Sequence, residues 1–196
     1  MKLRFLSIPV LFVLIQCVEK NDPVPANTQL LRNSDLELSM DSVHPWRATN
    51  PSPFELFVST EIYRSPSRAL AIRNNDFNAR SAGVWSQTYT GEMPRTGRSL
   101  RLKAYIKGEN IKRNGAGSNV YLAIRTFHEE GRSQSTFGRF VSTDNIASIS
   151  GTFDWAPLSL TLPSIQENIS SIVVYLVMTA GTTGTVYFDD ISLTVE

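Results

Sequence analysis

The stretch that decides the fold is residues 184–196, which read GTVYFDDISLTVE. Apolar and polar residues alternate on both sides of an acidic pair, Asp189 and Asp190, which is the period-2 pattern of a β-strand. A closing strand this apolar is predicted to pair near the middle of a sheet. Carboxylates there are costly to remove from water unless a cation or hydrogen-bond donors meet them. Ca²⁺ is a natural candidate because it binds carboxylate and carbonyl oxygens. The alternative is that the acids face water where the strand leaves the sheet.

Short alternating stretches of the same kind fill the chain upstream, separated by Gly, Pro and Asn. They predict strands at residues 30–38, 55–63, 69–73, 84–90, 100–107, 120–128, 134–141, 155–162 and 172–179. Residues 42–54 and 108–118 read as loops. No stretch keeps the 3.6-residue apolar period of a helix. The sequence therefore predicts an all-β, two-sheet antiparallel β-sandwich of the jelly-roll type.

Strand alternation also predicts which side chains point outward from residues 84–90, 100–107 and 120–128. If these strands share a sheet, aromatic, amide and basic side chains gather on its outer face. Aromatic rings pack on the apolar face of a pyranose, while Arg and Lys donate to hydroxyls or to a uronate. The predicted ligand-binding residues are Trp85, Gln87, Tyr105, Tyr121, Arg125 and Phe127. The alternative is a core position for Trp85 and an ordinary solvated sheet face for the others.

The first residues resemble an export signal. Lys2 and Arg4 precede an apolar run, residues 6–15, that is too short to span a bilayer. The only cysteine, Cys17, follows as in the lipobox of bacterial lipoproteins, where the cysteine is lipidated. Gln16 departs from the small residue usual before that cleavage site, so a plain secretory signal or an uncleaved anchor is the alternative.

These features predict three parts: a lipoprotein signal peptide (1–16), a polar tether (17–29) and one domain (30–196). The predicted location is the bacterial outer membrane or cell surface, held by the N-terminal lipid. A periplasmic or secreted protein is the alternative.

Composition excludes some classes of function. The 196 residues are 41% hydrophobic and 19% charged with a net charge of +1, and no Lys/Arg tract indicates nucleic acid. The motifs GxSxG, GxGxxG and the P-loop are absent, and no carboxylate pair is placed like that of a glycosidase. The sequence therefore predicts a non-catalytic protein. A jelly-roll polysaccharide lyase that uses Tyr121, Arg125 and His128 is the remaining enzymatic alternative.

Six segments, in this order, resemble the galactose-binding-like jelly rolls of carbohydrate-binding modules, which accompany xylanases, cellulases and other exported enzymes. The segments are NSDLE (33–37), SPSRALAI (65–72), WSQ (85–87), LRLKAYIK (100–107), GTFDW (151–155) and FDDISL (188–193). The resemblance spans residues 30–196.

The resemblance implies a structural Ca²⁺ that joins Glu37, the turn at residues 65–68 and Asp189. It also implies non-catalytic binding of a polysaccharide or oligosaccharide, alone or beside a neighbouring carbohydrate-active enzyme. The alternative is a structural or adhesion lipoprotein whose sandwich binds a protein partner. An exposed aromatic groove with Arg or Lys pointing into it favours a sugar ligand, whereas a flat apolar patch favours a protein.

Overall fold

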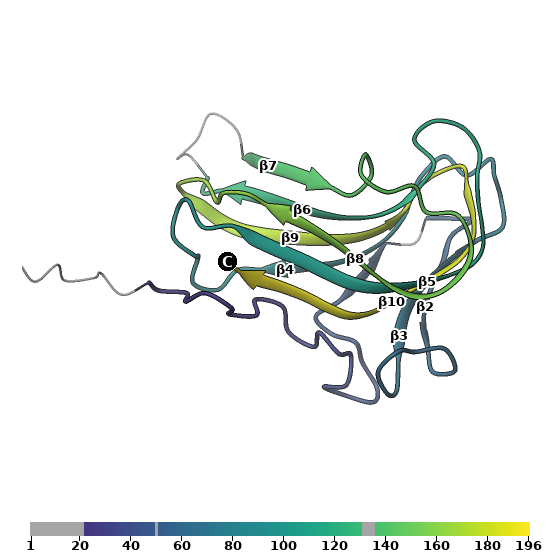
Figure 1. Cartoon of the computed structure of the whole chain (residues 1–196), viewed down its shortest axis with the longest axis horizontal. Helices are drawn as coiled ribbons and strands as arrows, with labels where there is room; N and C mark the ends of the chain where they lie inside the picture. Colours follow the sequence, from purple (N-terminus) through teal and green to yellow (C-terminus); the bar gives the residue numbers. More distant parts are fainter. Residues whose placement is uncertain (1–21, 50, 131–135) are drawn as a thin grey trace, which may run out of the picture.

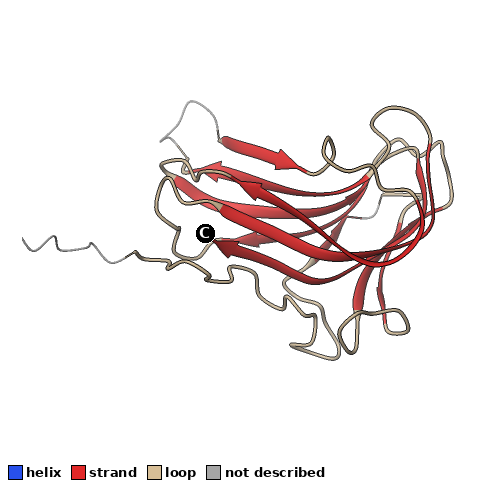
Figure 2. Cartoon of the chain, viewed as in Figure 1, coloured by secondary structure: helices blue, strands red, loops and turns tan. Residues whose placement is uncertain are grey.

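The computed structural model describes residues 22–49, 51–130 and 136–196, which form ten strands and no helix (Figure 1; Figure 2). The predicted signal peptide and Cys17 lie outside the described residues. Within those ranges no helix is long and apolar enough to cross a membrane. The strands are β1 (Arg47–Thr49), β2 (Glu55–Ser59), β3 (Ala69–Asn74), β4 (Gly83–Tyr89), β5 (Leu100–Arg113), β6 (Val120–His128), β7 (Phe137–Ser142), β8 (Gly151–Leu162), β9 (Ile169–Met178) and β10 (Thr182–Val195).

The strands form two five-stranded sheets that face each other. Sheet I has the order β1-β4-β9-β6-β7, and sheet II has the order β2-β3-β10-β5-β8. Every neighbouring pair is antiparallel. The predicted two-sheet antiparallel β-sandwich is therefore confirmed.

The closing strand β10 lies in the middle of sheet II, between β3 and β5, as the sequence predicted. Its alternate side chains point toward sheet I, and Phe188 is completely buried. The two sheets enclose one main core, because each presents a row of aliphatic side chains to the other. Fully buried members include Leu70, Ile72, Leu100, Leu102, Leu122, Ile124, Ile172 and Leu176.

Residues 100–107 and 120–128 do not share a sheet, so the condition for a common ligand face is not met. β5 pairs with β10 and β8 in sheet II, whereas β6 pairs with β9 and β7 in sheet I. The predicted faces of both strands are nevertheless correct, since Leu102 and Leu122 point into the core and Tyr105 and Tyr121 point outward. Alternation defines the face of a strand, but long-range pairing decides its sheet.

Residues 30–38 do not form the predicted strand. Gln29 makes one isolated bridge with Thr194, and farther along Ile191 N donates to Ser34 O. Asn33 and Leu36 have φ angles of 50° and 67°, in the left-handed region, so the chain cannot remain extended there. Residues 30–40 form an irregular strap, whose first part runs beside the end of β10.

Two of the predicted loops contain strand residues. β1 lies inside residues 42–54, and β5 continues through Gly108 to Arg113. Gly108 faces Phe153 of β8, and a Cβ at this glycine would lie 2.3 Å from the Phe153 ring. The glycine belongs in the strand because the ring occupies the space that a side chain would need.

The described part of the predicted tether, residues 22–29, lies against the domain. Val24 is buried in the main core cluster, and Asn27 N donates to Val195 O at 2.7 Å. Asp22 forms an ion pair with Arg98 at 3.1 Å. This segment therefore adds to the core at one end of the sandwich.

Candidate functional site

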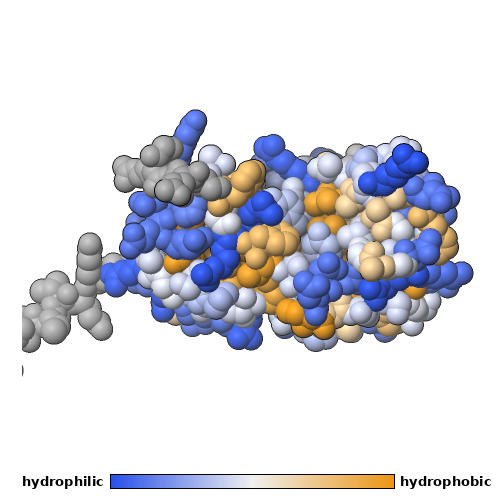
Figure 3. Space-filling model, turned by 90° about the horizontal axis from the view of Figure 1, so that it is seen from above, coloured by the Kyte–Doolittle hydropathy of each residue, from blue (hydrophilic) through white to orange (hydrophobic). Residues whose placement is uncertain are grey.

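The outer face of sheet I carries an open groove of about 350 Å³ that crosses β4, β9, β6 and β7. Its volume falls within the range of small-ligand sites. Figure 3 shows the molecule from above, from the side on which β7 lies in Figure 1, and hydrophobic patches lie there among hydrophilic residues. The groove is lined by Ala82, Val84, Tyr121, Ala123, Arg125, Phe127, Phe137, Phe140, Tyr175 and Val177.

Strand register explains why these side chains meet. Residues opposite one another in neighbouring antiparallel strands point to the same side of a sheet. Tyr175 of β9 lies opposite Ala123 of β6, so its ring stands beside a small residue. Small side chains, such as Ala123 and Val177, thus lie between taller aromatic ones. The groove follows from this alternation of small and large residues across the strands.

Arg125 stands among aromatic rings at the β7 side of the groove. Its guanidinium carbon lies 4.7 Å from the centroid of the Phe140 ring and 5.4 Å from that of Phe137. Phe127 packs against Phe137 with ring centroids 5.8 Å apart. Phe137 and Phe140 are 59% and 45% exposed, so these rings present open surface as well as holding the cation.

Two tyrosines supply hydroxyl groups to the groove. Burial raises the pKa of Tyr121 above its ordinary value, and the nearby Asp144 carboxylate raises it further. Burial also raises the pKa of Tyr175, although the charge of Arg125 partly opposes this shift. Both phenols are therefore protonated at neutral pH and can donate as well as accept hydrogen bonds.

Three of the predicted ligand-binding residues, Tyr121, Arg125 and Phe127, line this groove together. Sequence reasoning missed Phe137, Phe140 and Tyr175. The signal for Tyr175 was present, since it is the polar-tipped residue in an otherwise apolar strand, IVVYLVM (172–178). Nothing local indicates Phe137 and Phe140, because their position depends on the pairing of β7 with β6.

Trp85 and Gln87 point to the other side of sheet I and do not reach the groove. Trp85 is buried in the core, where its Nε1 donates to Ala71 O at 3.1 Å. Gln87 is 3% exposed; its Nε2 donates to Arg32 O and its Oε1 accepts from Arg32 N. Trp85 and Gln87 thus point inward from β4 and alternate with its outward residues. Trp85 fills the core, and Gln87 holds the strap at Arg32.

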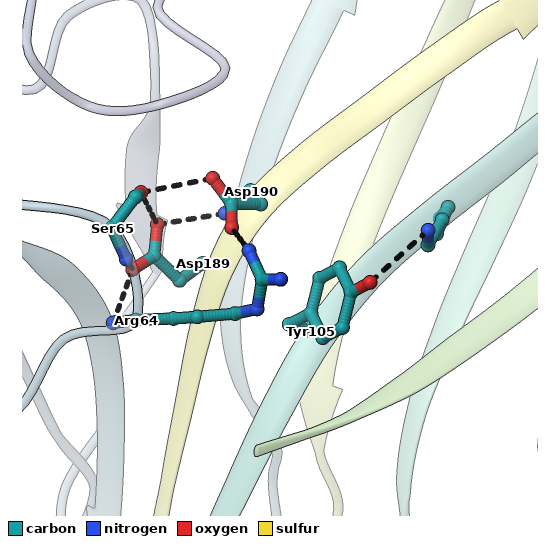
Figure 4. A network of polar contacts seen from close by, with 6 residues as sticks. Arg64, Ser65, Tyr105, Asp189 and Asp190 are labelled. Carbon is teal, nitrogen blue, oxygen red and sulfur yellow. Dashed lines mark hydrogen bonds and ion pairs between the residues drawn. The ribbon is translucent and has the colours of Figure 1, made fainter.

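Tyr105 lies on the outer face of sheet II, away from the groove residues. Figure 4 shows the Arg64 side chain extended over its ring, with the guanidinium carbon 3.6 Å from the centroid. Lys103 Nζ lies 3.4 Å from the Tyr105 hydroxyl oxygen. Because β5 belongs to sheet II, Tyr105 cannot share a ligand face with Tyr121.

The acidic pair of β10 binds the turn that precedes β3 (Figure 4). Asp189 is completely buried, and its Oδ2 accepts from Arg64 N at 2.7 Å and from Ser65 N at 3.0 Å. Its Oδ1 accepts from Ser65 Oγ and from Asp190 N. Burial raises the pKa of Asp189, and these backbone donors oppose the rise. Asp190 pairs with the Arg64 guanidinium.

Glu37 and Arg68 join the strap to the same turn. The Glu37 carboxylate accepts from Ser67 N and from Ser67 Oγ. Arg68 is 4% exposed, and its guanidinium donates to the backbone oxygens of three strap residues, Leu36, Ser39 and Met40. The turn thus connects both predicted calcium ligands, as the family resemblance implied, but it does so through hydrogen bonds.

Calcium requires several oxygen ligands directed at one point. Here the carboxylate oxygens of Asp189 and Glu37 face N–H and O–H donors, and the backbone oxygens nearby face the Arg68 cation. Among the described residues no group of three or more His, Cys, Asp or Glu side chains is placed to hold a metal. The described residues as arranged do not fit the calcium ion that the resemblance implies, and a measurement with a chelator tests this.

We expect a chelator such as EDTA to leave the Tm of the protein unchanged, because Arg68 already supplies the buried positive charge.

The Arg68→Met variant should lower the free energy of unfolding by about 3 kcal/mol, since three backbone oxygens lose their donor. Thermal melts in excess Ca²⁺ and in EDTA measure both effects. A Tm that falls on chelation and recovers with Ca²⁺ would contradict this expectation and support a calcium site.

No family model and no curated protein matches the chain. Solved structures with a similar fold do exist. The chain is similar to TmCBM61 in complex with β-1,4-galactotriose, with a TM-score of 0.50 and 16% identity over 86% of this chain and 99% of that one. It is also similar to the CBM22-1–CBM22-2 tandem of Paenibacillus barcinonensis Xyn10C, with a TM-score of 0.54 and 14% identity over 89% of this chain and 48% of that one.

The enzymatically active domain of tailspike protein 4 from bacteriophage CBA120 has a TM-score of 0.60 and 11% identity over 86% of this chain. This chain spans only 21% of the length of that protein. At these identities the likeness shows the fold alone. The domain has the jelly-roll β-sandwich fold of carbohydrate-binding modules, and enzymes contain similar sandwiches.

Proposed function

We propose that this domain binds a polysaccharide or oligosaccharide in the groove of sheet I and does not cleave it. The observation that carries the proposal is the lining of the groove, in which five aromatic rings surround one arginine. Rings of this kind pack on the apolar faces of sugar rings, and the two phenols and the guanidinium bond to hydroxyls. The fold shared with carbohydrate-binding modules supports the same function.

The alternative functions fit the groove less well. A lyase that used Tyr121 as a base would need its phenol to lose a proton, but burial raises the pKa of Tyr121. His128 does not line the groove, and its Nδ1 lies 3.2 Å from the backbone oxygen of Glu167. A protein partner would favour a flat apolar patch, whereas this surface is hollowed and contains a cation.

Export and lipid anchoring belong to the same proposal. They are supported by Lys2 and Arg4, the apolar run that follows them, and the position of Cys17. A lipid at Cys17 would hold the domain at the outer membrane or cell surface, where polysaccharides and a neighbouring carbohydrate-active enzyme are accessible. Metabolic labelling with a fatty-acid analogue, compared between the wild-type chain and Cys17→Ser, tests this part.

We expect Tyr175→Ala and Phe140→Ala each to weaken glycan binding about tenfold, which corresponds to about 1.4 kcal/mol, because each removes a ring from the groove. The full chain, purified in mild detergent, is first screened on soluble neutral and acidic polysaccharides and then titrated by calorimetry. Tyr105→Ala, on the outer face of sheet II, is the matched control and should bind normally.

A loss of binding in Tyr105→Ala alone would place the site on sheet II and contradict the proposal. Absence of binding to every polysaccharide would contradict carbohydrate binding itself. Unsaturated products released from a uronate polymer would indicate the lyase instead.

A further inference from the structure

The charge on the side chains that line the groove indicates which class of sugar it binds. Among the described residues that line it, Arg125 is the only charged side chain, and none of them carries a carboxylate. The Asp144 carboxylate raises the pKa of Tyr121, toward the other end of β6, and it accepts a hydrogen bond from Asn119 Nδ2 at 3.0 Å. Among the described lining residues, the charge therefore lies at the Arg125 end of the groove.

The Arg125 guanidinium is held but not neutralised. None of the ion pairs within residues 22–49, 51–130 and 136–196 includes it. Its contacts are instead with the faces of Phe140 and Phe137, which restrict the plane of the guanidinium and leave its N–H groups for another partner. Its side chain is half-buried, so a pair formed here is screened less by water than a pair on the open surface.

The geometry points to a carboxylate-bearing sugar, a uronate residue of an acidic polysaccharide, whose carboxylate pairs with Arg125 while its ring packs on the neighbouring aromatic side chains. This inference rests on the proposed carbohydrate function and adds the ligand class. A planar carboxylate can accept two parallel hydrogen bonds from the planar guanidinium, and such charge-assisted bonds are about twice as strong as bonds between neutral groups. A neutral sugar would leave the Arg125 guanidinium bonded to hydroxyls alone.

The test compares acidic polymers with neutral polymers of the same linkage. Polygalacturonate, alginate and glucuronan are each titrated beside their carboxyl-reduced forms, in which the carboxylate is replaced by a hydroxymethyl group. We expect at least one acidic polymer to bind the full chain about tenfold or more tightly than its reduced form, in line with hydrogen bonds to charged groups. Added salt should reduce this difference in affinity between the acidic polymer and its reduced form, because it screens the ion pair.

Variants then assign the preference to Arg125. Arg125→Gln should abolish the difference between an acidic polymer and its reduced form, because it weakens binding of the acidic polymer far more than binding of the reduced form. Arg125→Lys should keep only part of the preference, because an ammonium group cannot form the two parallel bonds. Arg139→Gln is the matched control; Arg139 lies on β7 with an exposed side chain outside the groove lining, and this variant should behave as the wild type.

Each other outcome is informative. Equal binding of acidic and reduced polymers would overturn the uronate inference and leave the carbohydrate function standing. A preference that survives Arg125→Gln, or one for sulfated over carboxylated polymers, would also overturn it. No binding to any polymer by a wild-type chain with an intact melting transition would overturn both the inference and the proposed function.

Discussion

Replacing Phe188 by alanine is expected to lower the free energy of unfolding by about 3–5 kcal/mol, the range for a buried phenylalanine. Phe188 has no exposed surface and lies in the central strand of sheet II, opposite Leu70 of β3 and Ile106 of β5. Both neighbours belong to paired strands, so the surrounding core cannot easily collapse into the space that the ring leaves.

Urea denaturation followed by circular dichroism measures this loss. Phe77→Ala is the matched control, because Phe77 is 39% exposed and lies outside the strands, and we expect a change within about 0.5 kcal/mol. A loss below about 1 kcal/mol for Phe188→Ala would show that the centre of the sandwich is less tightly packed than the structure indicates.

Replacing Asp189 by alanine is expected to cost about 3 kcal/mol, although it removes a buried acid. The carboxylate accepts from the backbone N–H groups of Arg64, Ser65 and Asp190, and its loss leaves these donors without their partner. Asp189→Asn should also destabilise the protein, because one side of the carboxylate would become an NH₂ group facing backbone N–H donors.

The neighbouring acid provides the comparison. Asp190 has a φ of 47°, at the irregularity in the pairing of β10 with β5, and its side chain is partly exposed. Asp190→Asn keeps a residue that tolerates this φ and removes mainly one surface ion pair, so we expect a loss of less than about 1 kcal/mol. Equal losses at the two positions in thermal melts would contradict the role assigned to the buried carboxylate.

Together these residues explain how the ends of the domain are joined. Asp189 holds the turn before β3, and Glu37 and Arg68 join the strap to the same turn. The carbohydrate-binding-module resemblance predicted that this region would be joined. It did not indicate that hydrogen-bond donors and an arginine would occupy the positions around the acids.

Only part of the groove could be predicted from the alternation of apolar and polar residues along the strands. The outward positions of Tyr121, Arg125 and Phe127 were predictable, because a strand with one buried face must alternate. Their meeting with Tyr175, Phe137 and Phe140 was not predictable, because it depends on which strands pair with β6 and in which register.

The sequence by itself determined the all-β class, the faces of β5 and β6, and the central place of the closing strand. These properties follow from local alternation and from the apolar character of single stretches. Only the tertiary structure decided that β5 and β6, although consecutive, lie in opposite sheets. That choice separates Tyr105 from Tyr121 and places Arg125 among the rings of β7, because the period of two residues specifies a face and carries no information about the partner strand.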